Sequence, residues 1–173
     1  MRILFIPGIK TWEFYLKPWR KDLPKSFPKD EIVFLDDIFY IHFEKEKCEK
    51  IVEHGVNLLN DGKETIVLAH SFGGILGKTI ISRAENHNVK RLVTLGSPHQ
   101  MNLFGVKQTK NFLETPDTVN VPTVTYGGYF DNVVPYQWTN TDNSKHTNLW
   151  CTHIGFMLRA KVRARIISDL RLF

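Results

Sequence analysis

The sequence predicts one α/β domain over residues 1–173, with a mostly parallel sheet of about six strands and helices on both faces. Short runs rich in isoleucine, valine and leucine recur along the chain with little alternation between apolar and polar residues. This pattern is typical of strands that are covered on both sides. Longer segments with apolar residues three or four positions apart separate the runs, which indicates helical crossovers between parallel strands.

The expected strands end in turn-forming or short polar residues. Five runs are clear, at 2–8, 31–37, 65–71, 91–97 and 122–128, and a weaker sixth lies at 147–151. The five clear runs end in Pro7-Gly8, Asp36-Asp37, His70-Ser71, Gly96-Ser97 and Gly127-Gly128. Active groups of open parallel sheets collect beyond the carboxyl ends of the strands. The sequence therefore predicts its chemistry at this edge.

Amphipathic helices are expected over 43–60, 73–87 and 155–171, because each has one apolar stripe. The last helix also has a cationic face, made of Arg159, Lys161, Arg163 and Arg165. We favour a helix that covers the sheet and keeps these cations in water over one that touches an anionic membrane.

Four aromatic residues crowd the segment 11–20, namely Trp12, Phe14, Tyr15 and Trp19. We favour a short helix that packs these rings into the core. The alternative is that they line a substrate pocket, with Trp12 as a tentative binding residue.

Composition excludes several classes of protein. The net charge is +5, but lysines and arginines are spread along the chain, which favours a solvated basic surface over nucleic-acid binding. The cysteines, Cys48 and Cys151, lack metal-ligand spacing. The first residues form neither a signal peptide nor a membrane span, so we expect a cytoplasmic protein without an integral membrane segment. The sequence does not indicate an oligomeric state.

Ser71 lies in "TIVLAHSFGGILG", between an expected buried strand and a glycine-opened helix. A nucleophile elbow has this context and the spelling G-x-S-x-G, in which small residues two before and two after relieve crowding. Ala69 and Gly73 meet that need, although Ala69 replaces the usual glycine. The alternative is a serine that caps the helix without any chemistry.

A serine nucleophile requires a base and an acid, which follow it along the chain in an elbow protein. Asp131 comes just after the fifth strand, whereas Asp117 and Asp142 lie in polar stretches that no strand precedes. His153 follows the sixth strand and should reach the same edge, while His146 should begin that strand at the opposite end. The sequence thus predicts Ser71, Asp131 and His153 as catalytic residues, with a turn aspartate as the alternative for Asp131.

Backbone amides of Phe72 and Ile9 are the expected oxyanion donors, because one follows the serine and the other follows the first strand. Residues 96–99 should form a wall of the site. The segment 99–120 is either an acyl-binding lip or a loop tucked over the core. Its apolar residues are Met101, Leu103, Phe104, Phe112 and Leu113, of which the first three are tentative substrate-binding residues.

The motifs "AHSFGG", "LGSPH" and "DNVVP", followed by a late histidine, resemble lipases and esterases of the α/β-hydrolase superfamily, especially small bacterial members. The resemblance implies a compact α/β-hydrolase fold with minimal or no lid, and the same roles for Ser71, Asp131, His153, Phe72 and Ile9. Family members usually carry His-Gly in the first loop, where this chain has Pro7-Gly8.

These observations together predict a serine hydrolase that cleaves small-molecule acyl esters through an acyl-serine intermediate, without a metal or organic cofactor. A thioesterase or an amidase would use the same three residues. A hydrolase-like module that binds a ligand without turnover is the remaining alternative.

Overall fold

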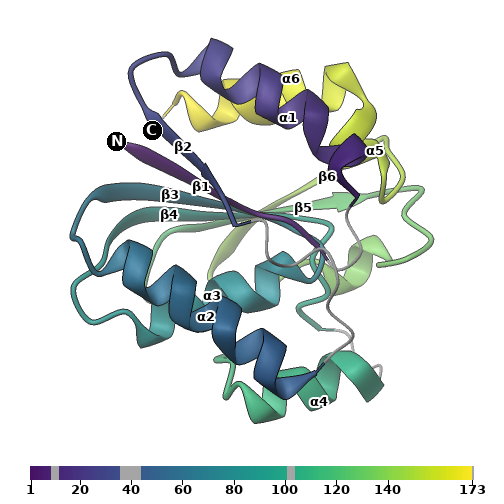
Figure 1. The fold of residues 1–173 in the computed structure, drawn as a ribbon. Helices are drawn as coiled ribbons and strands as arrows, with labels where there is room; N and C mark the ends of the chain where they lie inside the picture. Colours follow the sequence, from purple (N-terminus) through teal and green to yellow (C-terminus); the bar gives the residue numbers. More distant parts are fainter. Residues whose placement is uncertain (9–11, 36–43, 101–103, 173) are drawn as a thin grey trace.

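The computed structural model describes residues 1–8, 12–35, 44–100 and 104–172 (Figure 1). Its centre is a six-stranded sheet in the order β2-β1-β3-β4-β5-β6, in which every pair of neighbours is parallel. The strands are β1 Arg2–Ile6, β2 Glu31–Phe34, β3 Glu64–His70, β4 Asn88–Leu95, β5 Thr123–Gly128 and β6 Ser144–Leu149.

All six expected strands are present, and the parallel sheet is confirmed. The last strand was placed wrongly: it covers Ser144–Leu149 and not 147–151. The reason is that β6 is an edge strand whose residues are mostly half-buried, so it lacks the continuous apolar run of a central strand. His146 accordingly lies within β6 and not at its start.

Helices cover both faces of the sheet, as expected (Figure 1). One face packs against α1 Glu13–Ser26, α5 Gly155–Leu158 and α6 Ala160–Leu170, and the other against α2 Lys45–Leu59 and α3 Gly73–Arg83. A further helix, α4, spans Phe104–Phe112. Each face has its own core: the first core lies between the sheet and α1, α5 and α6, and the second lies between the sheet and α2 and α3. In β1, Ile3 and Phe5 enter the first core while Leu4 and Ile6 enter the second. Because both faces are covered, the strands show no polar alternation.

Three of the expected helices differ in the structure. The helix expected over 73–87 ends at Arg83. The segment 155–171 is broken at Arg159, whose extended backbone separates α5 from α6. Its cationic face is also not uniformly solvated, because Arg163 is buried and its Nε lies 2.8 Å from Asp22 Oδ2 of α1. The first helix continues from Glu13 to Ser26.

The aromatic segment at the start of α1 divides between core and solvent. Trp19 is fully buried, and α1 continues past Pro18 because Leu16, Trp19 and Leu23 form one buried stripe. Trp12 and Phe14 are exposed instead. Core packing was therefore the right expectation for Trp19 but not for Trp12 and Phe14.

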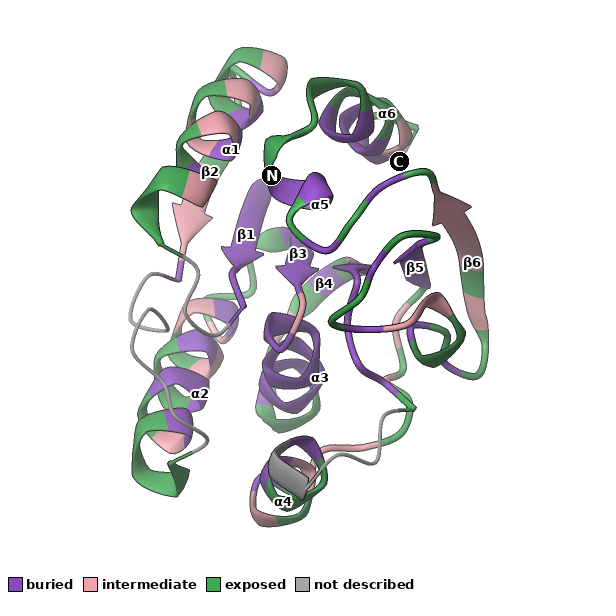
Figure 2. Cartoon of the chain, turned by 90° about the vertical axis from the view of Figure 1, so that its right-hand side faces the viewer, coloured by how far each residue is buried: buried purple, intermediate pink, exposed green. Residues whose placement is uncertain are grey.

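The α3 helix is buried along most of its length, from Gly73 to Ile81, and lies directly under the sheet in the end-on view of Figure 2. Next to it, the polypeptide after α4 closes over the second core. Leu113 is fully buried in that core, and Phe112 packs partly buried against it. The part of segment 99–120 that includes Leu113 is thus tucked over the core, while Met101 and Leu103 lie outside the described residues.

A buried lysine ties this closing segment to α3. The Lys78 ammonium donates to the Asp117 carbonyl and, at 3.0 Å, to Thr141 Oγ1. Burial lowers the pKa of Lys78 to about 8. Thr79 Oγ1 lies 2.7 Å from Thr115 Oγ1 and adds a second link. Side-chain hydrogen bonds thus anchor residues 115–117 to the helix that follows Ser71.

Gly73, at the start of α3, meets the end of β1 at close range. A methyl group there would contact the Ile6 carbonyl oxygen and lie 2.6 Å from that of Pro7, whereas at Gly77 the nearest atoms would be 3.5 Å away. Backbone atoms cannot move aside as flexible side-chain ends can.

We predict that Gly73→Ala lowers the free energy of unfolding by about 2 kcal/mol or more, because it forces backbone atoms apart. The matched change Gly77→Ala should raise it by about 0.5–1 kcal/mol, because alanine favours the helix and has room. Urea unfolding of both variants measures the difference. Equal effects at the two positions would contradict the close contact between α3 and β1.

Candidate active site

Ser71 occupies a sharp turn between β3 and α3. Its φ of 54° lies in the left-handed region, which non-glycine residues seldom adopt. The turn is held by a hydrogen bond from the Ser71 amide to the Leu95 carbonyl at 2.8 Å and by one from the Gly74 amide to the Ser71 carbonyl at 3.0 Å. Ala69, which departs from the usual spelling of the elbow, is fully buried in the core.

His153 lies between the end of β6 and the start of α5, and its ring reaches the serine. The His153 Nε2 atom is 2.9 Å from Ser71 Oγ, although 82 residues separate the two along the chain. The Nδ1 atom on the other side of the ring is 2.7 Å from Asp131 Oδ2. The structure therefore brings together the three residues that the sequence singled out.

Asp131 follows β5, and the loop behind it fixes its carboxylate. Its Oδ1 atom accepts the amides of Val133 and Val134 at 2.9 and 2.8 Å, and the side chain is completely shielded from solvent. One oxygen is thus held by the backbone, and the other faces the imidazole. A carboxylate in this position favours the tautomer of His153 that carries hydrogen on Nδ1.

That tautomer determines the direction of the next hydrogen bond. With hydrogen on Nδ1, Nε2 of His153 has a free electron pair and accepts the hydroxyl hydrogen of Ser71. A serine that donates to an oriented imidazole is the arrangement needed to activate a hydroxyl as a nucleophile.

His70 contacts the same histidine, a contact that the sequence did not predict. Its Nε2 donates to the His153 carbonyl at 3.2 Å, and the two ring centroids lie 4.7 Å apart. Burial, followed by the neighbouring His153, lowers the pKa of His70 well below the ordinary value. The sequence analysis gave His70 no role, but its side chain supports the loop that carries His153. Its position directly before Ser71 was the available signal.

The expected wall at 96–99 is buried beside the start of α3. A methyl group on Gly74 would contact the Ser97 side chain, whose hydroxyl has no hydrogen-bond partner among the described residues. His99 Nε2 lies 3.0 Å from Thr94 Oγ1. Burial lowers the pKa of His99 well below the ordinary value, and the charge of Lys78 lowers it further.

The expected oxyanion donors are only partly described. Phe72 directly precedes α3, at the positive end of the helix dipole. Gly8, after β1, approaches the nucleophile closely, since a methyl group there would lie 2.7 Å from Ser71 Cβ. Ile9 lies outside the described residues.

Of the four tentative substrate-binding residues, Trp12 alone has a side chain among those that the structure describes. Trp12 is 71% exposed just before α1. Met101 and Leu103 lie outside the described residues, and Phe104 begins α4. Among the side chains that are described, no group of three or more His, Cys, Asp or Glu residues is arranged to hold a metal ion.

Comparison with known proteins places this geometry in context. The model of one family, described as a PGAP1-like alpha/beta domain, matches residues 42–157, a segment that contains Ser71, Asp131 and His153. A comparison with curated protein sequences finds no match.

Solved structures resemble the chain over nearly its full length. The enol-lactonase from Burkholderia xenovorans LB400 has a TM-score of 0.72 and 10% identity, covering 99% of this chain and 91% of its own. The RedJ thioesterase of prodiginine biosynthesis in Streptomyces coelicolor has a TM-score of 0.64 and 13% identity, covering 98% and 89%. The monoacylglycerol lipase of Paleococcus ferrophilus has a TM-score of 0.65 and 10% identity, covering 98% and 93%. These likenesses confirm the expected fold class.

Burial of neutral His99 predicts a loss of stability in acid. Because its pKa is lowered in the folded state, the unfolded chain binds more protons once the pH falls below the ordinary histidine pKa, about 6.5. His99 therefore costs no stability above that pH and destabilises the fold progressively below it. We predict that His99→Gln reduces the slope of unfolding free energy against pH by up to about 1.4 kcal/mol per unit in that acidic range.

Urea unfolding of the His99→Gln variant and the wild type at a series of pH values tests this prediction. Glutamine keeps a polar group near Thr94 Oγ1, which limits the change to the loss of titration. A slope identical to that of the wild type would contradict it.

Proposed function

This chain belongs to the PGAP1-like alpha/beta domain family within the α/β-hydrolase superfamily, and we propose on that premise that it is a serine hydrolase of carboxylic esters. The observation that carries the proposal is the unbroken hydrogen-bond chain from Ser71 through His153 to Asp131. In the proposal Ser71 is the nucleophile, His153 the general base and Asp131 the residue that orients the base.

Acylation begins when His153 Nε2 takes the Ser71 proton as Oγ attacks the ester carbonyl carbon. A carbon–oxygen bond forms, and the electron pair of the carbonyl moves to its oxygen. The positive charge on the imidazole is stabilised by Asp131, which is oriented for this by the amides of Val133 and Val134. As the tetrahedral intermediate collapses, the bond to the leaving alcohol breaks and His153 returns the proton to it.

Deacylation repeats these steps with water. His153 takes a proton from a water molecule whose oxygen attacks the acyl carbon, and collapse of the second intermediate releases the acid and returns the proton to Ser71 Oγ. Each proton taken by the imidazole is given back within its half-reaction. The proposed cycle therefore requires only ester and water.

The negative oxygen of each intermediate needs donors already in place. We assign this role to the backbone amides of Phe72, at the start of α3, and Ile9, after β1. The close approach of Gly8 to Ser71 supports the second assignment, because it brings the residue before Ile9 next to the reacting oxygen.

Thioesters and amides share the acyl half of this reaction with esters, and the similar structures include a thioesterase, a lactonase and a lipase. We propose esters as the substrate class because the motifs of the chain resemble those of esterases and lipases. A panel of p-nitrophenyl esters, acyl thioesters and anilides with matched acyl groups ranks the three classes directly. Faster turnover of thioesters or anilides would change the class but not the triad.

Replacement of the nucleophile tests the proposal most simply. We predict that Ser71→Ala lowers the turnover of a short p-nitrophenyl ester on the order of a millionfold, as in comparable triads. The matched control is Ser97→Ala, which removes another serine hydroxyl at a strand end and one with no partner among the described residues. It should keep wild-type turnover. Ester hydrolysis by Ser71→Ala at the wild-type rate would contradict the proposal.

Replacement of the acid tests the orientation of the base. We predict that Asp131→Asn lowers turnover on the order of ten-thousandfold, because an amide can present hydrogen to Nδ1 and so favour the wrong tautomer of His153. Steady-state kinetics with the same ester measures the loss, with circular dichroism as a check of folding. A loss smaller than about tenfold in a folded variant would remove Asp131 from the triad.

A further inference from the structure

Most exposed large apolar side chains among the described residues lie on two segments, one after β5 and one after β6. Ten large apolar side chains are exposed in the described part of the chain, and seven of them lie within residues 129–138 and 150–158. The seven are Tyr129, Phe130, Val133, Trp138, Trp150, Ile154 and Leu158. Single exposed apolar residues are ordinary, but clusters mark surfaces that bind something.

Four aromatic rings on these two segments contact one another. We call them the aromatic patch, and they belong to Tyr129, Phe130, Tyr136 and Trp150. The centroid of Tyr129 lies 5.0 Å from that of Trp150 and 5.4 Å from that of Tyr136, and the Phe130 centroid lies 5.5 Å from that of Trp150. Trp150 is 68% exposed and Phe130 57% exposed. The patch is therefore continuous and open to solvent.

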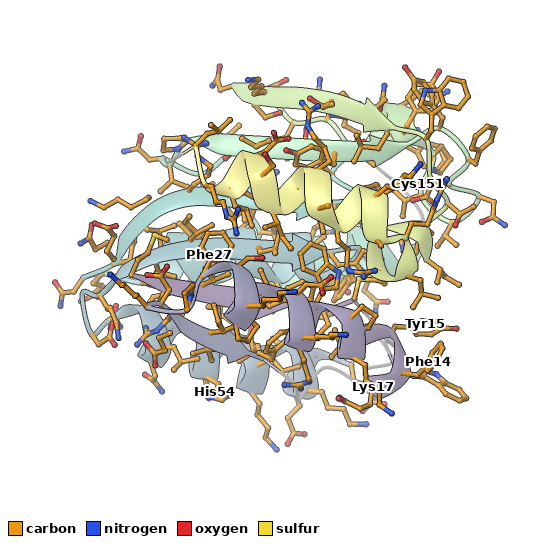
Figure 3. All side chains as sticks on the ribbon, turned by 90° about the horizontal axis from the view of Figure 1, so that it is seen from above. Phe14, Tyr15, Lys17, Phe27, His54 and Cys151 are labelled. Atoms are coloured by element: carbon orange, nitrogen blue, oxygen red, sulfur yellow. The ribbon has the colours of Figure 1, made fainter. Side chains whose placement is uncertain are left out.

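The aromatic patch lies at the same edge of the sheet as the triad. Tyr129 and Phe130 directly precede Asp131, and Trp150 lies three residues before His153. Figure 3 shows Cys151, the neighbour of Trp150, at the end of the molecule where the strands terminate. Any surface that meets the patch is thus brought next to the site of Ser71.

The two segments that carry the patch have exposed charges of one sign. Within residues 129–138 and 150–161 the only carboxylate is Asp131, whose side chain is fully buried. The cations Arg159 and Lys161 are exposed in the same segments, and Arg159 also donates to the Trp150 carbonyl. Residues 129–138 and 150–161 therefore present aromatic and cationic groups without an exposed negative charge of their own.

We propose that the aromatic patch docks this protein on an anionic lipid bilayer. Tryptophan and tyrosine favour the interface between lipid and water, and each nearby cation adds attraction to anionic headgroups. Loop tips that carry rings and cations suit insertion into headgroups. Docking is peripheral, because among the described residues no helix is both long and apolar enough to cross a bilayer. Delivery of a lipid ester to Ser71 from that surface rests on the proposed function, whereas the docking itself does not.

Co-sedimentation with vesicles tests the docking. We predict that the protein binds phosphatidylcholine vesicles containing about one third phosphatidylglycerol, and binds pure phosphatidylcholine less well. The double change Phe130→Ser with Trp150→Ser should weaken binding to the anionic vesicles about tenfold or more, because it removes apolar area that the bilayer would cover. High salt should weaken the binding of the wild type.

Leu172→Ser is the matched control, because Leu172 is 74% exposed near the C-terminus, at the end of the sheet opposite to the strand tips (Figure 1). It should bind vesicles as the wild type does. The proposal is overturned if the wild type does not co-sediment with anionic vesicles, or if the double variant binds them as strongly as the wild type does. The former outcome would leave a protein partner as the occupant of the patch.

Two further readouts separate this inference from the proposed function. Ser71→Ala should still bind anionic vesicles, because the docking surface does not include the nucleophile. The Phe130→Ser, Trp150→Ser double variant should hydrolyse a short soluble ester as the wild type does, which also shows that it folds. Loss of docking with hydrolysis intact, or the reverse, thus identifies which of the two proposals fails.

Discussion

The hydrogen bond between Ser71 and His153 joins residues 82 positions apart, and it depends on β3, β5 and β6 ending at the same edge of one parallel sheet. Each triad member follows one of these strands, and each strand is fixed in register by its neighbours. A crossover returns the chain to the start of the sheet between one strand and the next, and it contains an α-helix everywhere except between β5 and β6, where only a short 3-10 helix, Tyr136–Trp138, is present. Without the parallel order, the three side chains would leave the sheet at different ends.

Local features then refine what the sheet positions. The left-handed backbone at Ser71, the two amides on Asp131 and the ring of His70 against His153 each fix one triad member. Two of these features cost stability, because the Ser71 backbone is strained and the burial of neutral His70 destabilises the fold once the pH falls below the ordinary histidine pKa. Apolar cores on both faces of the sheet offset that cost.

Much of this arrangement could be predicted from the sequence. The rule that active groups lie beyond the carboxyl ends of parallel strands requires only that the strands be recognised in order. His153 was placed at the correct edge even though β6 was displaced by several residues, since either placement of the strand ends before His153. The contact of His70 with His153 was missed, although His70 directly precedes Ser71, because the contact depends on where the loop after β6 turns. The burial of Arg163 was also missed, because its partner Asp22 lies on α1, which is distant along the chain.

The central claim is that Ser71 is made nucleophilic by His153 and Asp131. Labelling with a fluorophosphonate, followed by peptide mass mapping, tests it most directly, because this probe bonds only to an activated serine. The account predicts a single adduct on the peptide that contains Ser71, and none in a folded His153→Gln variant. An unlabelled wild-type protein, or an adduct that forms as readily without His153, would contradict it.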